Sequence, residues 1–254
     1  MALLQWMLEN ISDDNSIKMS LEEQHETFQI NVKWLKFLNL SDSDIVQLQN
    51  VYKLVQRDRE RLIIYPDPQN VHSWSYLCSP EEIKVIIVGQ DPYPDGRGHG
   101  LAFSTVRGCS PPNSLKTIFA ELERTIENFK APAHGSLKSW CAQGVLLLNT
   151  VFTVIRGVPM SHEAIGWQVL SNRIINQLSE KMQNLVFMLW GSQARKLVSL
   201  IDSKKHLILE CAHPSPRTKG SKTPFIGCGH FLKANKYLQI HNKCPIDWNI
   251  TNDL

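Results

Sequence analysis

The sequence lacks the features that carry a chain into or across a membrane. No window approaches the roughly 18 uninterrupted apolar residues that a membrane-spanning helix requires. Residues 1–11 contain Glu9 and no basic run, so a signal peptide is not indicated. We therefore expect a soluble, intracellular protein without a membrane partner.

Cysteine patterns that form disulfide frameworks or metal sites are also missing. The six cysteines include no C-x-x-C pair, which predicts free thiols in a reducing compartment. Two C-x-H pairs do occur, Cys211-Ala-His213 and Cys228-Gly-His230, and a zinc site built from them is an alternative. Their spacing is unlike the familiar zinc patterns, so we favour small apolar cysteines beside histidines that have other roles.

Several catalytic signatures are absent as well. The chain has no G-x-S-x-G elbow and no G-x-x-x-x-G-K-[ST] loop. The glycines Gly96, Gly98 and Gly100 lack the further glycine that a dinucleotide loop needs for close helix packing. These absences disfavour a serine hydrolase and a phosphate-loop enzyme, and they weaken the alternative of another nucleotide-binding α/β enzyme.

What the chain does have is enough apolar sequence for a sizeable core. Of its 254 residues, 43% are hydrophobic and 20% charged, and no repeat or flexible linker divides it. We expect one domain over 1–254, with an N-terminal helical layer in 1–60 and an α/β core in 61–245. Residues 191–243 hold ten Lys/Arg against two Asp/Glu. Such an excess is typical of a phosphate-neutralising surface, although solvated lysines on a helix face would give the same pattern.

Hydrophobic periodicity predicts an α/β fold. Two sets of apolar residues in the first sixty residues recur with a helical period. They are Leu3, Trp6, Met7 and Ile11, and then Ile45, Leu48, Tyr52 and Val55, where Ser41 is the expected N-cap. Continuous apolar runs typical of buried strands then cover 83–88, 145–148, 185–189 and 207–209, and helical faces lie between them at 115–126, 170–182 and 197–201. We expect a three-layer α/β/α sandwich with a central, four-stranded, largely parallel sheet and an N-terminal helical layer.

Polar or Gly/Pro-rich residues follow each predicted strand. Asp91 comes after the first strand, Asn149 ends the second, and His213 follows the fourth. Ligands bind beyond the carboxyl ends of the strands in open parallel sheets, so these side chains are expected at one edge. Taken singly, Asp91 or Asn149 could be a capping residue, Phe103 a core residue and His213 a structural histidine. Their joint placement at strand ends favours a functional site.

Six ordered motifs resemble the family 1 uracil-DNA glycosylases, over about 65–237. They are Gly-Gln-Asp-Pro-Tyr (89–93), Gly-Leu-Ala-Phe-Ser (100–104), Pro-Pro-Asn-Ser-Leu (111–115), Gly-Val-Leu-Leu-Leu-Asn (144–149), Leu-Trp-Gly-Ser (189–192) and His-Pro-Ser-Pro (213–216). The stretch 199–209 looks more like the herpesvirus branch than the cellular enzymes. The resemblance implies hydrolysis of the N-glycosidic bond of deoxyuridine in DNA, without a metal or cofactor.

The resemblance also implies a role for each site residue. Asp91 and His213 are expected to be catalytic, Asp91 beside the cationic sugar and His213 as a neutral donor to the uracil O2. The substrate-binding residues would be Gln90, Tyr93, Phe103 and Asn149. The DNA contacts would come from Pro111, Pro112, Ser114, Gly191, Ser192, Ser215 and, in a weaker correspondence, Arg217. Because these motifs contain no lysine, we expect a glycosylase without strand cleavage.

Two positions depart from the family pattern. Pro94 stands where the family usually has a histidine for phosphate or water contacts, so that contact is lost or is supplied by a neighbour such as Arg97 or His99. The basic segment 217–224 begins with Arg217 where the family generally carries a leucine wedge. Arginine can stack or hydrogen-bond in the vacated space, but it is not an apolar wedge.

The expected partner is uracil-containing DNA, single or double stranded. DNA-mimicking protein inhibitors and viral replication proteins are further candidate partners, and we expect a monomer that works in the nucleus. The competing interpretation is a catalytically weak DNA-binding scaffold for viral replication proteins. Retention of Asp91, Asn149 and His213 argues against that interpretation.

Overall fold

A four-stranded parallel sheet forms the centre of the computed structural model, which describes residues 19–218 and 222–250. The strands are β2 (Val85–Gly89), β3 (Val145–Asn149), β5 (Val186–Trp190) and β6 (Leu207–Cys211), in the order β3-β2-β5-β6. Every residue of β2, β3 and β5 is buried, which explains their continuous apolar runs. In β6, at the sheet edge, Glu210 is exposed. The predicted parallel sheet is confirmed.

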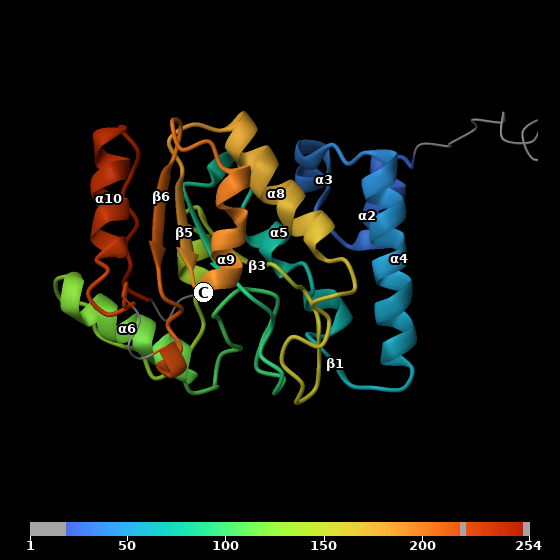
Figure 1. Cartoon of the computed structure of the whole chain (residues 1–254), viewed down its shortest axis with the longest axis horizontal. Coiled ribbons are helices and arrows are strands. Elements are labelled where there is room, and N and C mark those ends of the chain that lie inside the picture. The colour runs from blue at the N-terminus through green and yellow to red at the C-terminus, as the bar shows by residue number, and fades with distance from the viewer. Residues whose placement is uncertain (1–18, 219–221, 251–254) are drawn as a thin grey trace, which may run out of the picture.

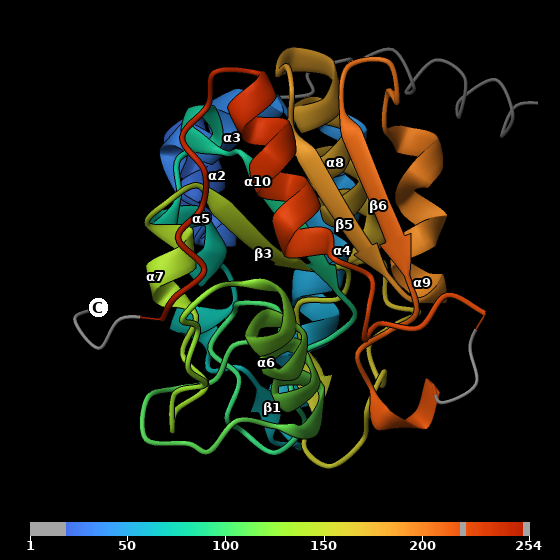
Figure 2. The same cartoon turned by 90° about the vertical axis from the view of Figure 1, so that its left-hand side faces the viewer.

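Helices cover both faces of this sheet, as the sequence predicted (Figure 1). Helix α10 (His230–Ile240) lies on one face, and α8 (Gln168–Lys181) with α9 (Ser192–Arg195) lies on the other (Figure 2). Helix α6 (Asn113–Thr125) packs against α10 and crosses beyond the carboxyl ends of the strands. The architecture is therefore a three-layer α/β/α sandwich.

The N-terminal helices form an additional layer outside α8. They are α2 (Leu21–Phe28), α3 (Val32–Leu38) and α4 (Asp42–Arg59). Helix α4 begins with a capping box in which Ser41 Oγ accepts the Asp44 N–H at 3.1 Å and Asp44 accepts the Ser41 N–H at 2.9 Å. Its predicted face is buried at Ile45, Leu48 and Val55. The helix predicted over Leu3, Trp6, Met7 and Ile11 lies outside the described residues.

Short elements complete the described chain. They are the antiparallel strands β1 (Ile64–Tyr65) and β4 (Val154–Ile155), helices α5 (Ser73–Leu77) and α7 (Lys138–Cys141), and the 3-10 helices Pro68–Asn70, Pro80–Glu82, Lys196–Leu200 and Pro216–Thr218. The sequence pattern did not indicate β1 or β4. The strand predicted from Ile83 begins two residues later, because Ile83 closes the 3-10 turn over Pro80–Glu82. Among the described helices, none combines the length and apolar character needed to cross a bilayer.

Candidate active site

The carboxyl ends of the four strands deliver the predicted catalytic groups to one edge of the sheet. Gly89 pairs with Asn149 across β2 and β3, and Trp190 pairs with Cys211 across β5 and β6. Asp91 follows Gly89 by two residues, and His213 follows Cys211 by two. The parallel register therefore aligns the strand ends, and the segments after them meet beside α6 (Figure 2).

Asp91 is a half-buried carboxylate held by a backbone donor. Its Oδ2 accepts the Met160 N–H at 2.7 Å. Burial raises the pKa of Asp91 above its ordinary value, and the Met160 N–H partly opposes that rise by stabilising the anion. The carboxylate is thus fixed in orientation while its negative charge is only partly solvated, which suits a group that must meet a developing cation.

His213 is fixed in one tautomer by its own loop. Its Nδ1 accepts the backbone N–H of Ser215 at 3.0 Å, so in the neutral ring the proton lies on Nε2. Burial lowers the pKa of His213, which keeps the ring neutral. The Thr218 hydroxyl donates to the His213 carbonyl at 2.7 Å and closes the turn. The result is a neutral hydrogen-bond donor at Nε2.

Phe103 and Tyr93 form an aromatic wall next to His213. The Phe103 ring centroid lies 5.7 Å from that of His213 and 5.4 Å from that of Trp190. Phe103 has a φ of 63°, a left-handed conformation that is strained for a bulky residue and is found most often at functional sites. The Tyr93 hydroxyl donates to the Phe103 carbonyl at 3.2 Å, so the two rings are linked.

Asn149 lies beside Gly89, a position at which a larger residue does not fit. Its side chain is 5% exposed. A Cβ at Gly89 would lie 2.4 Å from Asn149 Oδ1 and 2.7 Å from the Cβ of Ala102. The amide therefore occupies the space that any larger residue at Gly89 would take, and this close approach fixes its position.

Gln90 supports this part of the site through its backbone. Its carbonyl accepts the Val151 N–H and the Thr150 hydroxyl, each at 3.0 Å. These bonds tie the segment after β2 to the segment after β3. The backbone of Gln90 therefore links the two segments, and its role in substrate binding stays a prediction.

The residues expected to contact DNA lie on three segments around this edge. Pro112 precedes α6, and Ser114 lies in its first turn, where backbone N–H groups have no partner within the helix. Ser192 is exposed and begins α9. Ser215 lies in the His213 loop, and Arg217 lies in the following 3-10 helix, Pro216–Thr218. Helix α6 and the beginning of α9 lie at the carboxyl ends of the strands (Figure 2).

The backbone geometry at Gly191 requires a glycine. Its φ is 92°, and a Cβ there would lie 2.9 Å from the Cβ of His213. Its N–H donates to the Cys211 carbonyl at 2.9 Å. Gly191 therefore lets the end of β5 approach the catalytic histidine closely.

The structure decides between the two substitutes considered for the histidine missing at Pro94. His99 is 5% exposed, its Nε2 bonds to the Ser104 hydroxyl at 2.8 Å, and burial lowers its pKa to about 4. His99 is therefore a buried structural residue, and its proposed role is wrong. Arg97 remains partly exposed, pairs with Asp95 at 2.8 Å and donates to the Ser110 carbonyl at 3.4 Å.

Two supporting residues were missed by sequence reasoning. Met160 holds Asp91 through a backbone N–H, and Thr218 closes the His213 turn. A backbone donor that lies 69 residues from its acceptor leaves no side-chain signal in the sequence. Thr218 could have been noticed, because hydroxyl residues often bond to nearby backbone carbonyls in turns.

Of the four residues in the two C-x-H pairs, three lie close together in the structure and His213 does not. Cys211, Cys228 and His230 place ligand atoms within 4.8 Å of one another. His213 instead turns toward Phe103 and Ser215. The structure thus separates His213 from Cys211, so a zinc site built from both predicted pairs is wrong.

One cavity in the described part of the chain lies beside helix α4. It has a volume of about 630 Å³ and is lined by residues of α4 and by Tyr52, His72 and Trp167. His72 is fully buried there, and burial lowers its pKa to about 3. Its ring accepts the Trp74 indole N–H at 3.2 Å, which makes it a satisfied core histidine. None of the predicted site residues lines this cavity.

Comparison with known proteins agrees with this geometry. A family model described as the uracil DNA glycosylase superfamily matches residues 76–239. The chain is 58% identical to the uracil-DNA glycosylase of human herpesvirus 6A (strain Uganda-1102) over 255 residues, which covers 100% of both chains. It is 48% identical to the uracil-DNA glycosylase of human cytomegalovirus (strain Merlin) over 250 residues, covering 98% of this chain and 99% of that one.

Solved structures show the same fold. The crystal structure of mimivirus uracil-DNA glycosylase superimposes with a TM-score of 0.80 at 30% identity, covering 92% of this chain and 90% of that chain. A variant of that mimivirus enzyme, crystallised in complex with UGI, superimposes with a TM-score of 0.79 at 30% identity, covering 92% of each chain. These similarities extend across the sheet and the helices on both faces.

Proposed function

The chain belongs to the uracil DNA glycosylase superfamily, and we propose that Asp91 and His213 carry out its reaction. That reaction is the excision of uracil from DNA by hydrolysis of the N-glycosidic bond. The observation that carries the proposal is the Ser215 N–H bonded to His213 Nδ1, which leaves an Nε2–H donor for the departing base. A neutral donor aimed at the uracil O2 stabilises negative charge as it develops there.

Asp91 acts on the other fragment of the broken bond. As the base leaves, positive charge develops on the sugar, and a fixed carboxylate stabilises it and positions the attacking water. The Met160 N–H holds Oδ2 and leaves the rest of the carboxylate for this task. Since Asp91 and His213 come from different strand ends, each faces one of the two developing charges.

Base recognition follows from the remaining side chains. The flipped uracil loses its stacking partners, and Phe103 supplies a ring in their place. The Asn149 amide pairs with the uracil N3 and O4 edge, which mismatches cytosine because buried polar groups would stay unpaired. The Tyr93 ring blocks the space that the thymine methyl would need. Its hydroxyl bond to Phe103 keeps this wall in place.

DNA is held by the segments around the edge. Pro111, Pro112 and Ser114 present the start of α6 to a phosphate, and helix N-termini favour such anions. Gly191, Ser192 and Ser215 contact neighbouring phosphates through hydroxyls and backbone amides. Arg217 enters the space that the flipped nucleotide leaves.

The site motifs contain no lysine, so cleavage stops at the abasic site. Incubation with uracil-containing DNA and borohydride is expected to trap no covalent adduct, since no amine is present to form a Schiff base. A trapped adduct of protein and DNA would contradict this part of the proposal.

We propose further that the 1–254 chain works as a monomer in the nucleus, on single- or double-stranded DNA. The relatives named uracil-DNA glycosylase support DNA as the substrate, and the mimivirus complex with UGI supports an inhibitor partner. A DNA-mimicking inhibitor such as UGI and viral replication proteins are the proposed protein partners. Light scattering of the purified chain and microscopy of the tagged protein in cells test the oligomeric state and the location.

The deciding experiment measures free uracil released from a uracil-containing oligonucleotide in EDTA. Asp91→Asn is expected to lower kcat by about 10²-fold or more, because the amide cannot stabilise the cationic sugar. Wild-type activity should fall as the pH drops through the raised pKa of Asp91, while His213, with its lowered pKa, stays neutral through the ordinary histidine range. Full activity of Asp91→Asn would overturn the assignment.

A further inference from the structure

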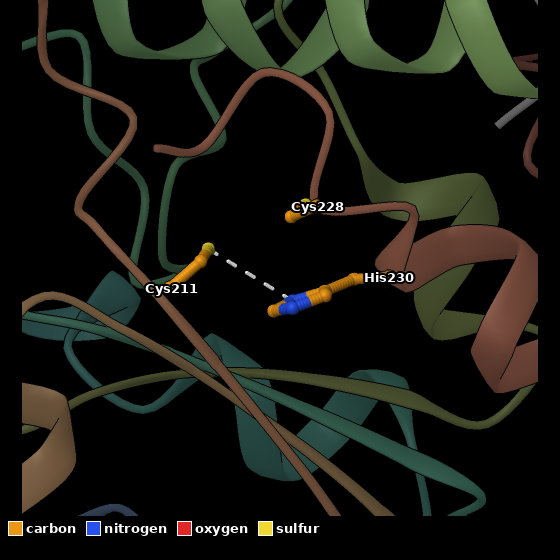
Figure 3. Close-up of side chains that lie close together, drawn as sticks. All are labelled: Cys211, Cys228 and His230. Atoms are coloured by element: carbon orange, nitrogen blue, oxygen red, sulfur yellow. Dashed lines mark hydrogen bonds between the residues drawn. The ribbon is translucent and has the colours of Figure 1, made fainter. Parts of the chain in front are cut away.

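Two cysteines and a histidine form a cluster that the excision reaction does not use. Cys211 ends β6, Cys228 lies two residues before α10, and His230 begins that helix. Figure 3 shows the three side chains turned toward one another, with Cys211 Sγ 3.9 Å from His230 Nδ1. The two sulfurs and the ring nitrogen lie within 4.8 Å of one another.

The polar groups around the two thiols already form hydrogen bonds within the protein. His230 Nδ1 accepts the indole N–H of buried Trp190 at 3.1 Å, so a cation at that nitrogen would have to displace this bond. The Glu121 carboxylate accepts the Cys228 thiol at 3.9 Å and the N–H groups of Gly227 and Gly229 at 2.7 and 2.8 Å. The thiols of Cys211 and Cys228 are therefore the reactive part of the cluster.

The two thiols differ in the way that a redox pair requires. Cys211 is 1% exposed, whereas Cys228 is partly exposed. A hydrogen bond from the Cys211 thiol lowers the pKa of Cys228, helped by the His230 backbone N–H and opposed by burial and the Glu121 charge, while the same thiol contact and burial raise the pKa of Cys211. A partly exposed thiolate is the form that oxidants attack, and a neighbouring thiol can then resolve the product.

We propose that Cys211 and Cys228 form a reversible disulfide when the protein meets a hydroperoxide. The Cys228 thiolate attacks the peroxide oxygen, the O–O bond breaks, and Cys228 becomes a sulfenic acid while the peroxide is reduced to hydroxide or an alkoxide. The Cys211 thiol then attacks that sulfur, an S–S bond forms, and water leaves with the Cys211 proton. Cys228 is the attacking residue and Cys211 the resolving residue.

The bridge would tie the end of β6 to the start of α10. Between these points lie His213, Ser215 and the 3-10 helix Pro216–Thr218. The base of this segment is already closed by the Ala212 N–H bond to the Thr223 carbonyl at 2.8 Å. Because the two sulfurs already lie within 4.8 Å of each other, a short approach of these side chains brings them to bonding distance.

The test treats the reduced full-length protein with equimolar hydrogen peroxide and maps its peptides by mass spectrometry. We expect a peptide linked through Cys211 and Cys228, about 2 Da lighter than the sum of its two reduced parts. Two of the six thiols should be lost and should return with dithiothreitol. Slower proteolysis between the two cysteines should accompany the link.

Variants separate the two roles. Cys211→Ser should leave Cys228 as a sulfenic acid that a dimedone probe captures, because the resolving thiol is gone. Cys109→Ser is the matched control, since Cys109 is also partly exposed, and it should form the same linked peptide as wild type. Circular dichroism checks that each variant is folded.

Three results would overturn the proposal. The first is a Cys228 that is oxidised no faster than Cys109. The second is the absence of the linked peptide in wild type. The third is stoichiometric binding of Zn²⁺ by the reduced protein that is lost in Cys211→Ser, which would assign the cluster to a metal. Each is read without a uracil assay, so it is independent of the function proposed above.

Discussion

Tyr93 is proposed to select the base by shape, and its hydroxyl also bonds to the backbone of Phe103, whose ring is the proposed stacking surface. The bond from Tyr93 Oη to the Phe103 carbonyl is 3.2 Å long. The Tyr93 ring is therefore held at its tip.

Tyr93→Ala should allow measurable release of thymine from T-containing DNA, because the ring no longer excludes the methyl group. A single methyl discriminates by roughly 10–200-fold in a hydrophobic pocket, so the gain should fall within that range. Tyr93→Phe keeps the ring and loses only the hydroxyl bond, so it should release no thymine. Thymine release by Tyr93→Phe, or none by Tyr93→Ala, would remove Tyr93 from base selection.

Gly191→Ala should inactivate a folded protein. The new Cβ would lie 2.9 Å from the His213 Cβ, and displacement of a catalytic group by about 1 Å can cost 10²-fold in rate. Gly108→Ala is the control, because Gly108 has a φ of 93° and nothing within 4 Å of its added Cβ. Both variants carry the backbone strain, so a loss of uracil release in Gly191→Ala alone isolates the contact with His213. Equal activity of the two variants would contradict that role.

At the level of elements, helices and strands could be predicted from the sequence where a long, regular hydrophobic pattern covers them. Buried strands β2, β3 and β5 appear as continuous apolar runs, and α4 follows its capping box and helical period. Strands β1 and β4 have two residues each, too few for any period to emerge. The site is predicted where side chains carry the chemistry, at Asp91 and His213, and missed where a backbone group does, at Met160.

Glu121 is a residue whose environment could not be predicted from the sequence, although the helix that carries it was predicted. Helix α6 was expected from its apolar face, yet Glu121 on this helix is completely buried. Its carboxylate accepts the Gly227 and Gly229 N–H groups and pairs with Arg124 at 3.3 Å. Gly227 and Gly229 lie more than 100 residues ahead, so only the folded structure explains why a charge is tolerated there.

Glu121→Ala should lower the free energy of unfolding by about 2 kcal/mol, because the hydrogen bonds from the Gly227 and Gly229 N–H groups to a buried carboxylate are lost. The measurement is urea unfolding followed by circular dichroism. Glu123→Ala on the same helix is the control, since Glu123 is exposed and its loss should change stability by about 0.5 kcal/mol or less. A similar small effect of both variants would show that the segment before α10 does not depend on Glu121.

At the level of the whole molecule, the basic segment 191–243 divides between two ends of the sheet. Lys204 and Lys205 precede β6 and therefore lie at its amino end, away from the site, where Lys205 Nζ donates to the Glu180 carbonyl at 3.1 Å. Lys222 follows the His213 loop at the carboxyl end and is exposed. The expectation that the whole excess borders the DNA is thus only partly right, because the sequence does not show which strand end a lysine occupies.

Lys222→Ala should therefore weaken DNA binding, and Lys204→Ala should not. Each phosphate contact contributes about one unit to the slope of log K against log salt, so loss of Lys222 should reduce that slope by about 1. The measurement is fluorescence anisotropy of an oligonucleotide across a salt series, with Asp91→Asn in both proteins to prevent turnover. Lys204→Ala removes the same charge from the opposite end, so net charge is matched. Equal slopes of log K against log salt for the two variants would mean that DNA binding depends on the overall charge of the protein and not on a basic residue near the site.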